Sequence, residues 1–121
     1  MKVSKGGKPQ IANYNARQYV QNRKVFMGSN TFAEWYEQGG AFFTDDIIKR
    51  YVVYSYRYDF PLFVWDELAG QWFENTTKYS QTTSKHKSQL HPLGDTVKLC
   101  LEDMLVVRNK GIVGLVEREV V

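Results

Sequence analysis

The chain lacks several features that would place it outside the cytoplasm or in a membrane. Cys100 is the single cysteine among 121 residues, which excludes a disulfide within one chain and fits a reducing compartment. No apolar run approaches the roughly 20 residues that span a bilayer. The lysine-rich start MKVSKGGKPQ lacks the apolar segment of a secretory signal. We therefore expect a soluble, cytoplasmic protein with no membrane partner.

Acidic residues are missing from two long windows of the sequence. No Asp or Glu precedes Glu34, and none occurs in residues 75–94. The basic residues of these windows are Lys2, Lys5, Lys8, Arg17, Arg23, Lys24, Lys78, Lys85, His86, Lys87 and His91. If the two windows meet in the fold, they form one positive face suited to phosphate groups. Otherwise they are a solvated tail and an ordinary polar loop.

The length and the composition fit one folded domain. A chain of 121 residues can bury a core without disulfides or metals. Its aromatic content of 15% indicates a core of large rings, a sticky face, or both. The Gly- and Lys-rich start predicts a disordered basic tail over residues 1–12. Residues 13–121 are then expected to form a single α+β domain.

Strand signals are clearest in the middle of the chain. Residues 51–56, 60–65 and 71–74 are rich in β-branched and aromatic side chains and are separated by turn residues. They predict a small antiparallel sheet, a meander near residues 51–74. Pro61 belongs at a sheet edge or at the first position of its strand, because proline cannot donate a ladder hydrogen bond.

Two helices are expected in the second half of the chain. Apolar residues recur with a helical period over residues 97–110, and Gly111 is a natural cap after them. This helix would place Cys100 on its buried apolar stripe. A short helix in the polar segment would run toward Leu90. Its cap would be one of the hydroxyl residues Ser80, Thr82 and Thr83.

These elements together indicate an α+β fold, in which the sheet packs against one C-terminal helix and the short helix of the polar segment. A compact β-barrel with one helix is the alternative. Residues 16–26 and 31–37 fit either a short helix or a strand, and residues 112–121 fit a last strand or an extended arm. Exposed sheet edges are compatible with a homodimer.

The polar segment that follows the third strand carries the functional prediction. A helix start beside hydroxyl, Lys and His side chains would offer free backbone N–H groups to an anion. Ser and Thr also favour caps and turns through local backbone bonds alone, which is the structural alternative. The ring of Tyr79 would pack on the sheet or stack on a base. The predicted ligand-binding residues are Lys78, Tyr79, Thr82, Thr83, Lys85, His86, Lys87, Arg23 and Lys24.

Patterns typical of catalysis or metal binding are sparse. His86, His91 and Cys100 match no zinc spacing. The sequence has no P-loop, no dinucleotide fingerprint and no serine-hydrolase elbow. We therefore expect a protein that is not an enzyme and needs no metal or cofactor. A small hydrolase or nuclease that uses His86 is the minor alternative.

Six short motifs between residues 17 and 92 carry a resemblance. They are R-x-Y-V from Arg17, F-x-G-S-N from Phe26, Y-V-V-Y-S-Y from Tyr51, P-L-F-V-W-D from Pro61, Q-W-F-E-N from Gln71 and K-Y-S-x-T-T-S-K-H-x-S-Q from Lys78. This series resembles a family of small, uncharacterised proteins encoded by bacteriophages. The resemblance implies an accessory protein made in the cytoplasm of an infected bacterium, and it favours host manipulation or defence evasion.

Two functions of different classes are expected on these grounds. The favoured one is a non-enzymatic phage accessory protein that binds nucleic acid or a nucleotide phosphate through its basic, hydroxyl-rich face. The alternative is an anti-defence protein that inhibits a host or bacterial defence factor by binding it. The aromatic anchors of such an inhibitor would be Trp35, Tyr36, Trp65 and Trp72.

Overall fold

A six-stranded sheet organises the protein, whose computed structural model describes residues 9–36, 49–78, 80–112 and 114–115. Its elements in chain order are η2 (Asn13–Asn15), α1 (Arg17–Gln21), β1 (Phe26–Met27), β2 (Thr31–Tyr36), β3 (Arg50–Ser55), β4 (Pro61–Asp66), β5 (Gln71–Asn75), α2 (Gln81–Leu90), β6 (Val97–Leu99) and α3 (Leu101–Lys110). The C-terminal helix and the strands confirm the expected α+β class.

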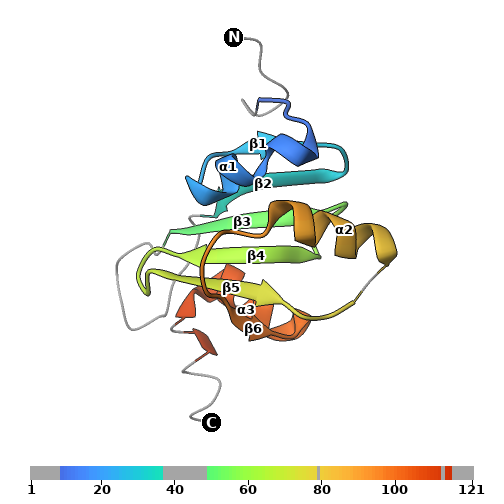
Figure 1. Cartoon of the computed structure of the whole chain (residues 1–121). Helices are drawn as coiled ribbons and strands as arrows, with labels where there is room; N and C mark the ends of the chain where they lie inside the picture. Colours follow the sequence, from blue (N-terminus) through green and yellow to red (C-terminus); the bar gives the residue numbers. More distant parts are fainter. Residues whose placement is uncertain (1–8, 37–48, 79, 113, 116–121) are drawn as a thin grey trace.

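The strands lie in the sheet in the same order as in the chain (Figure 1). Each of β1 to β4 pairs antiparallel with the strand that follows it. The last strand differs, because β6 pairs parallel with β5. A parallel neighbour requires the chain to cross a face of the sheet, and α2 forms that crossing. The helix of the polar segment is thereby brought onto the sheet.

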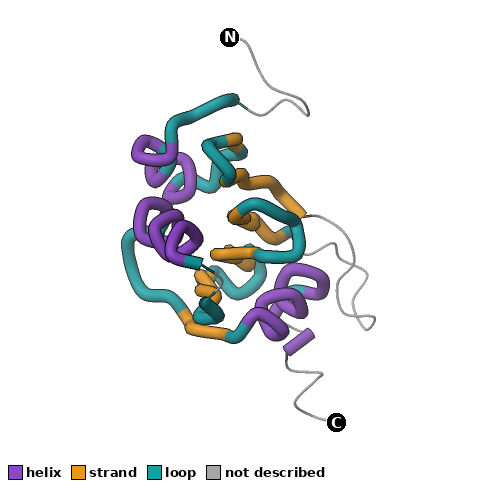
Figure 2. Tube along the Cα trace, turned by 90° about the vertical axis from the view of Figure 1, so that its right-hand side faces the viewer, coloured by secondary structure: helices purple, strands orange, loops and turns teal. Residues whose placement is uncertain are grey.

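Helices cover the sheet on both faces, as Figure 2 shows. On one face, Val20 of α1 and Leu90 of α2 share a buried cluster with Val53 of β3. On the other face, Met104 of α3 packs in a second cluster with Val52 of β3. Strands that are buried on both faces carry nearly continuous apolar runs instead of an alternating pattern. This explains the apolar runs of β3 and β4.

A β-bulge adjusts the face beneath α2. Val53 pairs with Phe63, but the next residue, Tyr54, pairs with Pro61, so that Leu62 is the extra residue of β4. An extra residue breaks the alternation of side chains between the two faces. Consequently Leu62 and Phe63 both join the core beneath α2. Pro61 occupies the first position of its strand, one of its two expected places.

Two charged residues of the sheet are fully buried beneath α3. The Nε and Nη2 atoms of Arg50 donate hydrogen bonds to the carbonyl oxygens of Arg108 and Asn109, at 2.9 and 3.1 Å. Asp66 Oδ2 accepts a hydrogen bond from the backbone N–H of Ile112 at 2.6 Å. Burial lowers the pKa of Arg50, and the charge of Asp66 opposes that shift. These contacts fix the C-terminal end of α3, where a cation is favourable.

The predicted start of the C-terminal helix is wrong. Residues 97–99 form β6, because they pair with Phe73, Glu74 and Asn75 of β5, and α3 begins only at Leu101. Cys100 is the N-cap residue with extended backbone, and it is exposed instead of buried. Residues 97–99 fit a helical pattern in the sequence, but hydrogen bonding to the open edge of β5 outweighs that tendency.

Other segments also differ from the expectation or resolve an ambiguity. Within the expected tail of residues 1–12, Ile11 N–H donates to Met27 O and Met27 N–H to Pro9 O, each at 2.8 Å. Residues 1–8 lie outside the described residues. Residues 16–26 contain the short helix α1, and 31–36 form strand β2. Of the expected last strand or arm, the described residues 112 and 114–115 are helical.

We expect Arg50→Met to undock the end of α3. The change removes the hydrogen bonds to Arg108 and Asn109 and the positive charge opposite the buried Asp66, and leaving a buried charge without its counter-charge costs about 3–5 kcal/mol. Urea denaturation should show a loss of this size in the free energy of unfolding. The control is Arg57→Ala, because Arg57 pairs with Asp59 on the exposed surface, and a loss below about 1 kcal/mol is expected. Equal losses in the two variants would contradict the anchoring role of Arg50.

Candidate functional site

Helix α2 presents one side to the sheet and the other to solvent. The Ser80 side chain caps it by accepting a hydrogen bond from the backbone N–H of Thr83 at 3.0 Å, as the sequence predicted for one of three hydroxyl residues. Thr83, His86 and Leu90 are buried on the sheet side, with the spacing of one helical face. Thr82 and Lys85 are exposed.

Buried polar groups hold the N-terminal half of α2 on β3. Ser55 Oγ lies 2.9 Å from His86 Nδ1 and 3.4 Å from Thr83 Oγ1. Burial lowers the pKa of His86, and the charge of Lys85 lowers it further, so that His86 is a neutral group near pH 7. Thr83 and His86 therefore connect α2 to the sheet, which corrects their expected place on a charged surface.

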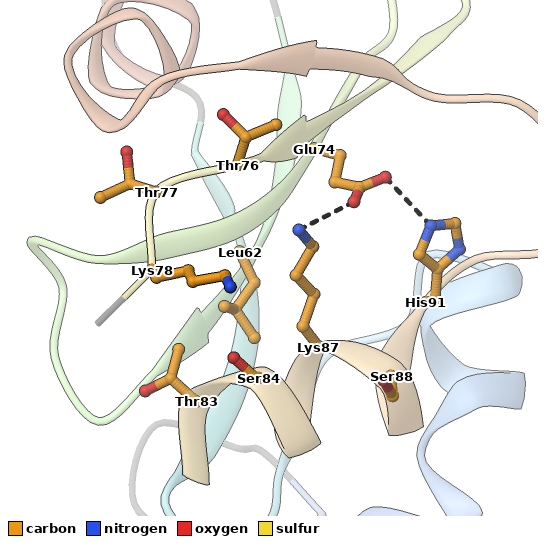
Figure 3. Close-up of a pocket in the computed structure, with 10 residues that line it drawn as sticks. All are labelled: Leu62, Glu74, Thr76, Thr77, Lys78, Thr83, Ser84, Lys87, Ser88 and His91. Atoms are coloured by element: carbon orange, nitrogen blue, oxygen red, sulfur yellow. Dashed lines mark hydrogen bonds and ion pairs between the residues drawn. The ribbon is translucent and has the colours of Figure 1, made fainter. Parts of the chain in front are cut away.

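A pocket of about 310 Å³ opens between α2 and strands β4 and β5. Its lining residues are Leu62, Glu74, Thr76, Thr77, Lys78, Thr83, Ser84, Lys87, Ser88 and His91 (Figure 3). We call this space the α2 pocket. It is rich in hydroxyl groups and lysine, and it contains a single carboxylate, that of Glu74.

The carboxylate of Glu74 is enclosed by donors. Oε2 lies 2.8 Å from Lys87 Nζ, and Oε1 lies 3.0 Å from His91 Nε2 (Figure 3). Oε1 also accepts a hydrogen bond from Thr96 Oγ1 at 2.6 Å. Burial alone would raise the pKa of Glu74. The hydrogen bonds from Lys87, Thr96 and His91 outweigh burial and lower the pKa to about 2. Glu74 is therefore an ionised, fully partnered acid at any physiological pH.

The two ring nitrogens of His91 both face acceptors. Nδ1 lies 2.7 Å from the carbonyl oxygen of Pro92, and Nε2 lies 3.0 Å from Glu74 Oε1. Neither a carbonyl oxygen nor an ionised carboxylate can donate a hydrogen bond. These two contacts hold the ring of His91 between Glu74 and the backbone of Pro92.

Three polar groups of the α2 pocket remain available to a ligand. Lys78 points into the pocket (Figure 3) and has no ion-pair partner within the described residues. The hydroxyl groups of Ser84 and Ser88 likewise have no hydrogen-bond partner there. Lys87 already offsets the charge of Glu74, so that Lys78 gives the pocket an excess of positive charge. An ammonium group beside free hydroxyl donors suits an anion such as phosphate.

The two acid-free windows of the sequence meet in the fold. Arg17 Nη2 donates a hydrogen bond to Ser88 O at 2.6 Å, and Leu93 N–H donates to Gln21 Oε1 at 2.6 Å. These bonds join α1 to the end of α2 and to the loop that follows. Helices η2, α1 and α2 and residues 91–94 contain no carboxylate, and we call the outer surface that they share the acid-free surface.

The predicted binding residues consequently separate into groups. Lys78, Thr83 and Lys87 line the α2 pocket. Of these three, Lys87 is already paired with Glu74. Thr82 and Lys85 lie on the exposed side of α2.

Neither Arg23 nor Lys24 lines the α2 pocket. The guanidinium of Arg23 lies over the ring of Trp65, 4.6 Å from its centre. The next residue, Lys24, is exposed to solvent. Tyr79 lies outside the described residues. The sequence interpretation missed Glu74, although strand alternation places it on the same face as the core residue Trp72.

Within the described residues there is no group of three His, Cys, Asp or Glu side chains placed to hold a metal ion. No helix in the same ranges is long and apolar enough to cross a membrane. Comparisons with protein-family models, curated proteins and solved structures found no match for this chain. Its function is therefore inferred from the chemistry of the site.

Ionised Glu74 should stabilise the fold in a defined pH range. Its pKa in the folded protein, about 2, lies below the ordinary value of 4.5, so that its contribution is complete above pH 4.5 and is lost as the pH falls toward 2. Glu74→Gln should therefore unfold at lower urea than the native protein at pH 6, and its stability should change less between pH 4.5 and 2.

The matched control for Glu74→Gln is Asp95→Asn, because Asp95 is exposed on the loop before β6. We expect Asp95→Asn to follow the pH dependence of the native protein in the same urea series. If Glu74→Gln follows it as well, the enclosed carboxylate does not stabilise the fold in the way proposed.

Proposed function

We propose that the protein binds phosphate groups of nucleic acid without catalysing a reaction, through the α2 pocket and the exposed side of α2. The observation that carries this proposal is the state of Lys78, which enters a hydroxyl-lined pocket without an ion-pair partner among the described residues. The one acid of the pocket, Glu74, is already paired with Lys87 and hydrogen-bonded to His91. A phosphate oxygen would therefore meet ammonium and hydroxyl donors with little repulsion.

The contact residues differ in part from those predicted by the sequence. Lys78 and Lys85 supply charge, and Thr82 with Ser84 and Ser88 supplies hydroxyl donors at the helix surface. Lys87 holds Glu74 in place and contributes to the local potential more than to direct contact. Such contacts to phosphate do not read the base sequence, so that binding should be general and sensitive to salt.

The resemblance to bacteriophage proteins suggests the cell in which this binding would take place. A small phage protein that binds nucleic acid would act in the cytoplasm of the infected bacterium as an accessory protein. The alternative function, inhibition of a host or defence protein, depended on exposed aromatic anchors. Trp72 is buried, and Trp35, Tyr36 and Trp65 are only partly exposed, so that these side chains offer little surface to a partner.

Replacing Lys78 and Lys85 together with alanine should weaken binding equally on oligonucleotides of unrelated sequence. Because two phosphate contacts are lost, the slope of log K against log salt should fall by roughly 1.5. Fluorescence anisotropy with labelled oligonucleotides at several salt concentrations measures both effects. Lys110→Ala on α3, which covers the opposite face of the sheet, is the control and should bind like the native protein.

Two results would count against the phosphate proposal. The first is the absence of binding to any nucleic acid or to inorganic polyphosphate at low salt. The second is a pull-down from bacteria in which a protein partner is retained after nuclease treatment, while purified protein binds no oligonucleotide. That second result would favour the inhibitor instead.

A further inference from the structure

A groove of about 420 Å³ lies beside α1, on the same side of the sheet as the α2 pocket. Tyr14 and Leu93 supply its large apolar side chains, and Arg17, Gln18 and Asn22 are among its polar ones. We call it the α1 groove. It belongs to the acid-free surface, since no Asp or Glu lines it.

Tyr14 is the most exposed large apolar side chain of the described residues, with 77% of its surface accessible. It has no ring contact and no hydrogen bond through its hydroxyl within those residues. Leu93, also in the groove, is 66% exposed, and its backbone N–H is held by Gln21. An exposed aromatic ring beside a fixed apolar residue is a surface on which a flat ring can stack.

The polar side chains of the α1 groove match the edges of a nucleobase. Gln18 carries an amide with both donors and an acceptor, and it has no side-chain hydrogen bond within the described residues. Amide side chains pair with base edges, and a guanidinium such as that of Arg17 pairs with a base or a phosphate. In a duplex the base faces are stacked on their neighbours, so that only an unpaired base can lie on Tyr14.

The α1 groove and the α2 pocket are neighbours. Arg17 lines the groove, and its guanidinium donates to the carbonyl oxygen of Ser88, which lines the pocket. The end of α2 therefore separates a site suited to a base from a site suited to phosphate. A single strand that crosses this end would present one group to each.

We infer that the α1 groove holds an unpaired base of single-stranded nucleic acid, stacked on Tyr14, while the backbone of the strand runs toward the α2 pocket. This inference rests on the proposed phosphate-binding function and adds a preference for single strands over duplexes. The shared chemistry of DNA and RNA fits the groove, and comparison of the two distinguishes them.

The test is fluorescence anisotropy on the full chain with a labelled single-stranded DNA 12-mer, the RNA of the same sequence, and the corresponding DNA duplex. Tyr14→Ala should weaken single-strand binding by at least about fivefold, the lower end of what one stacked base contributes. Tyr14→Phe should bind like the native protein, because stacking needs the ring and not the hydroxyl. The control is Tyr58→Ala. Tyr58 is exposed, and its ring packs against Phe32 on the face of the sheet that α3 covers.

The inference and the proposed function fail in different ways. If Lys78→Ala with Lys85→Ala weakens binding but Tyr14→Ala does not, or if the duplex binds at least as tightly as the single strand, the base site is refuted and phosphate binding stands. If Tyr14→Phe loses as much as Tyr14→Ala, stacking is refuted. If neither nucleic acid nor polyphosphate binds, both proposals fail. Thermal unfolding of each variant confirms that the comparison is between folded proteins.

Discussion

Burial of the sheet on both faces is the constraint on which the rest of the structure depends. A charged side chain on a covered strand must find its partner inside the protein, since an isolated buried charge is very costly. On the face of α3, Arg50 donates to carbonyl groups in the last turn of the helix, and Asp66 accepts from the backbone N–H of Ile112 just after it. On the face of α2, Glu74 meets it with Lys87 and His91. Each helix layer is thus fixed by charge as well as by apolar packing.

This requirement divides the polar segment between structure and function. Thr83 and His86 face the sheet and supply hydrogen-bond partners to the Ser55 hydroxyl, while Lys87 forms an ion pair with Glu74. Only the residues left over, chiefly Lys78 and Lys85, are able to meet a partner from outside. The polar segment of residues 75–94 has no acid in its sequence, but pairing of Lys87 with Glu74 leaves its surface only moderately positive. The α2 pocket opens at this surface. Such a surface fits phosphate contacts that are weak individually and act together.

The acid-free surface gains its extent from the contact between α1 and α2. Helix α1 has only five residues and carries no acid, and Arg17 and Gln21 attach it to the end of α2. The α1 groove and the α2 pocket lie side by side because of these bonds. Neither helix alone lines both the α1 groove and the α2 pocket.

The sequence by itself indicated the α+β class, a C-terminal helix and a hydroxyl cap for α2 at one of Ser80, Thr82 and Thr83, because these follow from local side-chain periods and from short-range hydrogen bonds. It also showed the absence of acids in two windows. Only the tertiary structure decided that these windows meet, that residues 97–99 pair with β5 instead of extending α3, and that Glu74 lies beneath Lys87. Those outcomes depend on which distant segments come together, and a local pattern carries no information about the partner across the sheet.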